Sequence, residues 1–193
     1  DKVFVEDTYY SDKPDLDRRV MAQRIAAYAD GKGWQVERVL REETGVLPVI
    51  MGGDLENYWA SGSGRTAKAG ARGAFLHPAT SYSVPEAVRN AIYISELPDY
   101  DGDRLNMLMR QRAQEHWKGG SFYRILNRML FRASEPGERY KLLERFYRLK
   151  PGLIERFYAG QSTGSDKARI LSGKPPVPIG KALQAIRARK TKR

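Results

Sequence analysis

Apolar and polar residues alternate along residues 2–10, KVFVEDTYY, as is typical of a β-strand. Residues 15–33 change to helical spacing, with a rough apolar stripe that Gly31 ends. Two further short runs, at residues 34–40 and 45–51, have the composition of strands. The order strand, helix, strand, strand predicts a small sheet layer with a helix on one face.

The pattern changes from residue 52 onwards. Residues 52–74 are crowded with glycine and small residues and are predicted to form a loop. Ser83 and Glu86 match a capping box, which predicts a helix that starts at Ser83. Beyond residue 103 the apolar residues keep helical spacing, most regularly along residues 122–130.

Turn-forming residues indicate the limits of these later helices. Pro136, Pro151 and Pro178 stand where first helical turns begin, and Gly160 and Gly173 stand where helices end. The sequence therefore predicts an α+β fold, a small sheet followed by a C-terminal array of helices. We divide the chain into a sheet layer at 1–51, a loop and helix at 52–95, and a basic helical region at 96–193.

Composition limits the classes of function. The 193 residues include no cysteine and two histidines, His77 and His116, so neither a disulfide scaffold nor a catalytic thiol is available and we predict no metal site. No run of about 18 apolar residues would span a bilayer. The chain opens without Met and without the features of a signal peptide, so we expect no such peptide and a longer parent polypeptide.

The net charge of +11 is unevenly placed. Residues 1–118 carry 16 basic and 18 acidic side chains, whereas residues 119–193 carry 18 basic and 5 acidic ones. Arg124, Arg128 and Arg132 recur beside an apolar helix face, and the tail RARKTKR adds five positive charges. This pattern suits an anionic membrane surface or nucleic acid, and equally a plain solvated helix face.

Glu6 and Asp7 are the first candidate for chemistry. A carboxyl group held on a strand among aromatic residues is partly desolvated, which favours its protonated form and makes it a candidate general acid. Regular alternation places the two side chains on opposite faces. The alternative is a structural pair of acids at a strand end, one exposed and one paired with an arginine.

The segment HPATSYS, residues 77–83, is the second candidate, because it delivers the chain to the start of a helix. Helix N-termini offer free N–H groups and a positive dipole end, which attract phosphate or a negatively charged ring system. The segment contains neither GxGxxG nor a Walker sequence. Its alternative is a plain capped helix after a loop, with His77 as a structural hydrogen-bonding residue.

Six blocks of the sequence together resemble the bacterial lycopene β-cyclase family of carotenoid biosynthesis. They occur in the family's order and are VFVEDTYYSD, REETGVLPV, RGAFLHPATSYSVPEAV, FYRILNRMLFRA, RFYRLKPGLIERFYAG and RILSGKPPVPIGKAL. The resemblance covers nearly the whole chain and corresponds to roughly the C-terminal half of such an enzyme. It implies a fragment of an α/β, Rossmann-type flavoprotein whose dinucleotide-binding half is missing, so we expect the fragment alone to be inactive.

The resemblance implies an intramolecular lyase, or isomerase, that cyclises the ψ-ends of lycopene to β-carotene through γ-carotene. The reaction has no net redox change, yet it requires reduced FAD, with NAD(P)H as the expected electron source. The family's acidic motif falls on EDT, which makes Glu6 the essential acid and gives Asp7 a supporting role. Related acyclic carotenoids are the other expected substrates.

The resemblance also places the HPATSYS segment beside the flavin. The residues implied are His77, Pro78, Thr80, Ser81 and Tyr82. The family commonly has Gly where this chain has Ser81, and a side chain there would crowd the flavin or demand a different backbone angle.

Because lycopene is dissolved in the bilayer, the resemblance implies peripheral attachment to the cytoplasmic side of the membrane through the basic helical half, with no nucleic-acid partner. Two other classes of function stay open. A flavin-dependent monooxygenase relative would hydroxylate its substrate and increase its mass. A basic helical domain that binds nucleic acid would not need the EDT or HPAT residues.

Overall fold

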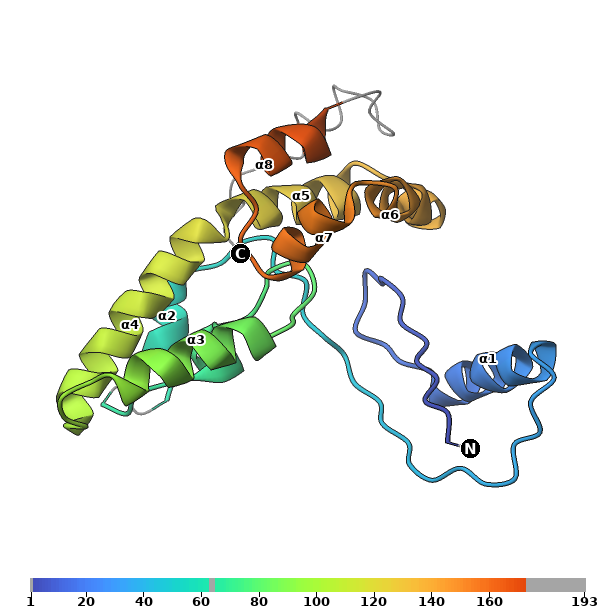
Figure 1. Ribbon diagram of the computed structural model, residues 1–193, viewed down its shortest axis with the longest axis horizontal. Helices are drawn as coiled ribbons and strands as arrows, with labels where there is room; N and C mark the ends of the chain where they lie inside the picture. Colours follow the sequence, from blue (N-terminus) through green and yellow to red (C-terminus); the bar gives the residue numbers. More distant parts are fainter. Residues whose placement is uncertain (1, 63–64, 173–193) are drawn as a thin grey trace. The chain divides into compact units, whose positions relative to one another are not determined.

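A computed structural model describes residues 2–62 and 65–172 (Figure 1). The chain divides into two compact units, Asp1–Leu47 and Pro48–Arg193, and each is described by itself. Every regular element among the described residues is helical. The predicted α+β class, with a small sheet ahead of the helices, is therefore wrong for this part of the chain.

The first unit contains one helix, α1 (Arg18–Gly31). The Asp17 carboxylate caps it by accepting from two backbone N–H groups of the first turn, at 3.0 and 3.1 Å. At the other end the Trp34 N–H donates to the Ala29 carbonyl at 3.1 Å while Gly33 takes φ +70°, a turn that commonly ends helices. The predicted helix and its end near Gly31 are confirmed.

The three predicted strands, at residues 2–10, 34–40 and 45–51, form neither strand nor helix. A strand is stable only when its backbone groups pair with a neighbouring strand, and no such pairing occurs among residues 2–62 and 65–172. Apolar side chains of these segments lie in solvent, and Phe4 is 82% exposed. An alternating pattern depends only on neighbouring residues in the sequence. It identifies segments that are suited to a sheet, but it does not show that a second strand lies beside them.

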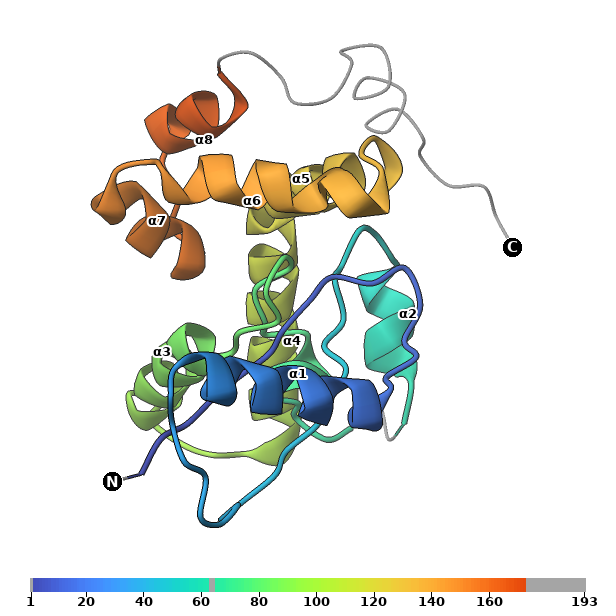
Figure 2. The same cartoon turned by 90° about the vertical axis from the view of Figure 1, so that its right-hand side faces the viewer.

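The second unit is an array of helices (Figures 1 and 2). Its helices and short 3-10 turns are α2 (Leu55–Ala60), η1 (Gly70–Gly73), α3 (Val84–Ser95), α4 (Gly102–Gly119), α5 (Ser121–Arg132), η2 (Pro136–Glu138), α6 (Arg139–Tyr147), α7 (Pro151–Tyr158) and α8 (Gly164–Leu171). The helices predicted from Ser83, from residue 103 and along 122–130 are confirmed. The loop predicted across 52–74 is wrong at α2, which the Asp54 carboxylate caps.

The chain changes direction between α4 and α5, at Gly119–Gly120 (Figures 1 and 2). A Cβ at Gly120 would lie 2.9 Å from the Arg124 guanidinium and 3.1 Å from the Pro78 ring, so glycine permits this close approach. Pro151 begins α7 as predicted. The predictions for Pro178 and Gly173 lie outside the described residues.

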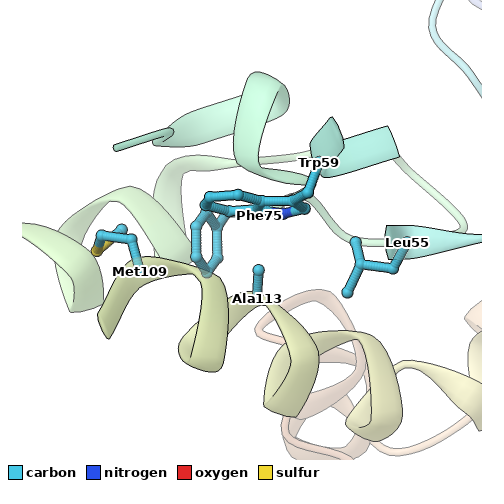
Figure 3. Close-up of a cluster of buried hydrophobic side chains, with 5 residues drawn as sticks. All are labelled: Leu55, Trp59, Phe75, Met109 and Ala113. Atoms are coloured by element: carbon cyan, nitrogen blue, oxygen red, sulfur yellow. The ribbon is translucent and has the colours of Figure 1, made fainter. Parts of the chain in front are cut away.

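The first buried cluster joins α2, the segment after η1, and α4. Figure 3 shows its five side chains, which are Leu55, Trp59, Phe75, Met109 and Ala113. The indole N–H of Trp59 donates to the Gly73 carbonyl at 3.3 Å, so the one polar atom of the ring is satisfied. This cluster fixes the chain that leads into residues 77–82.

The second buried cluster joins α5 and α7 to that segment. Its members are Ala79, Phe122, Tyr123 and Phe157. The Tyr123 hydroxyl lies 3.0 Å from the Ser162 hydroxyl and accepts from the Ser162 N–H at 3.1 Å, which ties α5 to the chain after α7. Residues 77–82 are therefore held between two cores. None of the described helices combines the length and the apolar character needed to cross a bilayer.

Candidate functional site

The predicted acidic pair lies in the first unit, ahead of α1. The Asp7 side chain is 18% exposed, and its Oδ2 lies 3.0 Å from Nε of Arg24 on α1. Glu6 is exposed, and its Oε1 accepts a 2.7 Å hydrogen bond from the Thr8 hydroxyl. Arg24 therefore balances the charge of Asp7, whereas Glu6 has a neutral partner and faces solvent. The partial desolvation expected for Glu6 is not present within this unit.

The second unit holds the HPATSYS residues in a closed loop. The His77 N–H donates to the Tyr82 carbonyl at 2.8 Å, and the Ser81 N–H donates to the His77 carbonyl at 2.8 Å. Ser81 takes φ +59°, in the left-handed region that costs a residue with a side chain about 1–2 kcal/mol. Its hydroxyl turns back and donates to the Pro48 carbonyl. The loop therefore has a fixed backbone shape.

Two polar side chains from neighbouring helices fix this loop. Nδ2 of Asn127, on α5, donates to the carbonyls of Ile50 and Pro78 at 2.7 and 2.8 Å. Nε2 of His116, on α4, lies 3.0 Å from the Leu76 carbonyl. Because a carbonyl can only accept, His116 carries a proton on Nε2. The loop is thus bonded to α4 and to α5.

His77 lies inside the molecule. It is 4% exposed, and its ring centre lies 4.4 Å from that of Tyr123 and 5.1 Å from that of Phe157. Its Nδ1 accepts from the Ala79 N–H at 3.2 Å, which puts the proton of the neutral ring on Nε2. Burial lowers the pKa of His77 to about 4. The imidazole is therefore neutral at physiological pH and supplies no positive charge.

Helix α3 begins directly after the loop, but the predicted capping box is absent. Ser83 is the N-cap residue, and its side chain makes no capping hydrogen bond. Glu86 pairs instead with Arg89, and its Oε2 lies 3.6 Å from Nδ1 of His116. The box is absent because Arg89 and His116, both partly exposed, hold the Glu86 carboxylate instead.

A small cavity of about 150 Å³ lies between the loop, the start of α3 and the end of α7. Its lining includes two histidines, a carboxylate and three tyrosines: His77, His116, Glu86, Tyr82, Tyr123 and Tyr158. Tyr82 and Tyr158 stack at 5.8 Å between ring centres.

Comparisons with known proteins support a single family. Residues 1–184 match the family model described as "Lycopene cyclase protein". The chain belongs to the lycopene cyclase family. It is 44% identical over 185 residues to the lycopene beta-cyclase of Pseudescherichia vulneris, 42% identical over 185 residues to that of Pantoea ananas, and 41% identical over 186 residues to that of Paracoccus sp. (strain N81106 / MBIC 01143).

Each alignment covers 96% of this chain and 48% of the relative. The chain therefore spans about half the length of the curated cyclases that it matches. No solved structure matches it.

The left-handed backbone at Ser81 suits the glycine that the resemblance implies at this position. Glycine reaches φ +59° without the clash that a Cβ brings. In this chain the serine keeps the glycine-like backbone and directs its hydroxyl to Pro48. The crowding of a flavin by Ser81 stays a prediction, and the loop keeps a turn of the glycine type.

The predicted basic stripe on α5 is only partly on the surface. Arg124 is buried, donates to the Trp117 carbonyl at 2.7 Å and stacks 4.1 Å above the Trp117 ring centre. Arg128 donates to the Met51 carbonyl at 2.6 Å. Arg132 is exposed. Arg124 and Arg128 therefore join parts of the chain to one another, and the tail RARKTKR lies outside the described residues.

Sequence reasoning missed His116 and Asn127, which hold the loop. The sequence did contain a signal for Asn127, which is a polar residue within the apolar repeat of residues 122–130. In the structure this residue is 2% exposed. A buried amide of this kind needs partners, and here they are backbone carbonyls. For His116 the sequence carried no comparable signal, because its partner Leu76 lies 40 residues away.

Proposed function

We propose that this chain is part of a lycopene β-cyclase that converts the linear ends of lycopene into β-rings. The observation that carries the proposal is the 41–44% identity to three lycopene beta-cyclases over 96% of the chain. Neither a monooxygenase nor a nucleic-acid-binding protein is among these relatives, so the two alternative classes are not favoured. Because the chain spans about half of each relative, we propose that it is inactive by itself.

Glu6 is the proposed general acid. Since Oε1 accepts from Thr8, Oε2 is the oxygen left to carry the transferable proton. That proton adds to C2 of the terminal C1=C2 double bond and leaves a cation at C1. The electron pair of C5=C6 then forms the C1–C6 bond and leaves a cation at C5, and the Glu6 carboxylate takes up the C6 proton, which restores a C5=C6 double bond within the ring. Atoms and electrons balance, so the step is an isomerisation.

Asp7 is the proposed supporting residue. Its ion pair with Arg24 holds the segment against α1, whereas no cationic partner of Glu6 is found among residues 2–62 and 65–172. This difference supports the assignment of the acid to Glu6, because the Asp7 carboxylate is already engaged in an ion pair with Arg24.

FAD is the proposed cofactor, and the loop of residues 77–82 is its proposed contact. The residues fit, because Ser83 leaves the first-turn N–H groups of α3 without a side-chain cap and the Ser81 hydroxyl is turned away toward Pro48. Thr80, Ser81 and Tyr82 are accessible, whereas His77 and Pro78 are buried and would act through the loop's backbone shape. When bound, reduced FAD would supply negative charge that favours a carbocation.

Peripheral attachment to the cytoplasmic face of an anionic membrane is the proposed location, with NAD(P)H as the proposed source of electrons. Lycopene and other acyclic carotenoids are the proposed substrates, and they dissolve in bilayers rather than in water. Exposed basic residues of α5–α8, such as Arg132, Arg148 and Arg169, support contact with anionic headgroups.

Pigment analysis tests the proposed function. Lycopene-accumulating bacteria would express the complete reading frame to which this chain belongs, as wild type, Glu6→Gln and Asp7→Asn. We expect the wild type to give β-carotene of the same mass as lycopene, Glu6→Gln to leave lycopene unchanged, and Asp7→Asn to retain part of the activity. An expressed, flavin-loaded wild type that leaves lycopene unchanged would refute the proposal.

A further inference from the structure

Helix α3 presents a mixed face of polar and apolar side chains to the rest of the second unit. Asn90 is 3% exposed and accepts from Nε of Arg112, on α4, at 3.0 Å. Arg89 donates to the Ala159 carbonyl, at the end of α7, at 2.7 Å. Glu86 pairs with Arg89 beside His116. The inner face of α3 is therefore attached by these polar bonds and by Tyr93 and Ile94, which pack against the first buried cluster.

The outer face of α3 is apolar and exposed. Val84, Val88 and Ile92 are 71%, 53% and 54% exposed and follow one another at a spacing of four. A row of small residues runs beside them, and the whole outer stripe consists of Val84, Ala87, Val88, Ala91, Ile92 and Ser95. The stripe contains no charged residue. A helix in water normally has the opposite arrangement, so this face is built to be covered.

The chemistry of the stripe favours a protein partner over a lipid surface. The aliphatic residues of the stripe form a ridge, and the small residues beside them form a groove. Another helix or strand can pack closely against such a surface. The chain just beyond α3 carries Glu96, Asp99, Asp101 and Asp103, of which Asp99 pairs with Arg104 and Asp103 with Arg65. This end of the helix therefore offers no excess of positive charge to attract anionic headgroups.

The length of the relatives indicates which protein covers the stripe. The curated cyclases are about twice as long as the matched segment. The first unit likewise leaves apolar side chains in solvent, including Phe4, Val36 and Leu40. Both units thus have apolar surface left over in a chain that spans half of a cyclase.

We propose that the outer stripe of α3 is the docking face for the part of the cyclase polypeptide that lies outside the aligned half. The stripe starts two residues after Tyr82, so docking would bring that part next to the loop of residues 77–82. The inference rests on family membership and not on the proposed cyclisation, and its test reads no activity.

The absence of cysteine from this chain makes a direct test simple. Val88→Cys and Ile92→Cys each introduce a single thiol on the stripe, and Met107→Cys, at a 60% exposed position of α4, is the matched control. Each full chain is labelled with a maleimide, alone and after co-expression with the part of the Pantoea ananas cyclase that lies outside the aligned residues. Mass spectrometry of this chain gives the labelling rate.

We expect all three thiols to react readily in the chain alone, because all three positions are exposed. In the complex we expect labelling to slow by about tenfold or more at positions 88 and 92 and to stay unchanged at 107. Equal labelling at all three positions in the complex would overturn the proposal, as would failure of the wild-type chain to form a complex. Protection by anionic vesicles alone, or by higher concentrations of the chain itself, would also overturn it in favour of a membrane or a second copy.

Discussion

The side-chain amide of Asn127 donates to the Pro78 carbonyl at 2.8 Å, and the same nitrogen donates to the Ile50 carbonyl at 2.7 Å. The Ile50 N–H in turn donates to the Pro78 carbonyl at 2.9 Å. One residue of α5 thus joins two segments that lie 49 and 77 residues away in the sequence. The shape of the loop that leads to α3 depends on this amide.

Replacing Asn127 tests that dependence. Asn127→Ala leaves two carbonyl oxygens without this donor, and we expect a loss of about 2–4 kcal/mol in the free energy of unfolding. Asn127→Asp has nearly the same size but no donor at pH 7 and adds a buried charge, so we expect an equal or larger loss. Urea denaturation measures both. Two variants as stable as wild type would show that the loop is held by other contacts.

Gly73 is predicted to be intolerant of any side chain. A Cβ there would lie 2.7 Å from two ring carbons of Phe75 and 2.8 Å from the Lys68 carbonyl oxygen. Phe75 is 1% exposed and cannot move away freely, so we expect Gly73→Ala to cost about 1–3 kcal/mol. Gly52→Ala is the control, because no atom lies within 4 Å of its Cβ position. Thermal unfolding should separate the two, and equal melting temperatures would contradict the prediction.

These contacts show why the sequence predicted some elements and not others. Helices α1 and α5 follow from apolar spacing and end signals that lie within about fifteen residues, so local reasoning found them. The segment 2–10 has the local pattern of a strand, but pairing depends on a partner elsewhere in space. An alternating pattern is therefore necessary for a strand but is not sufficient to form one.

The candidate site shows the same limit at the level of side chains. The sequence marked residues 77–83 as a loop before a helix, and the structure agrees. It did not reveal that Ser81 takes a left-handed backbone, because that depends on the bonds from His77 and Pro48. Arg124 looked like part of a solvated face, yet it is buried against Trp117. A long arginine side chain can bond to a backbone carbonyl outside its own helix. The spacing of arginines along the sequence does not reveal such a bond.

Ser81 should be replaceable by glycine at little cost. Ser81→Gly removes the strain of the left-handed backbone, about 1–2 kcal/mol, and also removes one hydrogen bond worth about 1 kcal/mol. We therefore expect its free energy of unfolding to lie within about 1 kcal/mol of the wild type. Ser81→Ala keeps the strain and loses the bond, so it should be less stable than Ser81→Gly by about 1 kcal/mol. Urea denaturation compares them, and an alanine variant more stable than the glycine variant would contradict this account.

Thr8 should affect the proposed cyclisation through Glu6. Its hydroxyl holds Oε1 of Glu6 at 2.7 Å, so Thr8→Val frees the carboxyl to rotate while nearly preserving side-chain volume. In the complete enzyme we expect Thr8→Val to lower kcat about tenfold, equivalent to roughly 1.4 kcal/mol. Thr8→Ser keeps the hydroxyl and should retain most of the activity. Rates of β-carotene formation give the comparison, and equal loss in both variants would point to packing of the threonine methyl group instead.

His77 should make the protein less stable in mild acid. Burial lowers the pKa of the folded-state imidazole to about 4, whereas the ring of an unfolded chain titrates near about 6.5. Between these pH values the unfolded chain binds more protons, so the free energy of unfolding falls as the pH drops from about 6.5 to about 4. The full loss is about 3 kcal/mol, because each pH unit of this window is worth about 1.4 kcal/mol.

His77→Asn isolates this effect, since its Oδ1 can still accept from the Ala79 N–H but the side chain does not titrate. At pH 7.5 the variant should be less stable than wild type by about 1–3 kcal/mol, because the ring contacts with Tyr123 and Phe157 are lost. As the pH is lowered to 4.5 the wild type alone loses the histidine contribution, so the difference should shrink or change sign. Urea denaturation at several pH values measures the difference in free energy of unfolding between the wild type and the variant. The contributions of the other titrating groups cancel in this difference. A difference that stays constant across this range would mean that His77 is not held in its neutral form by burial.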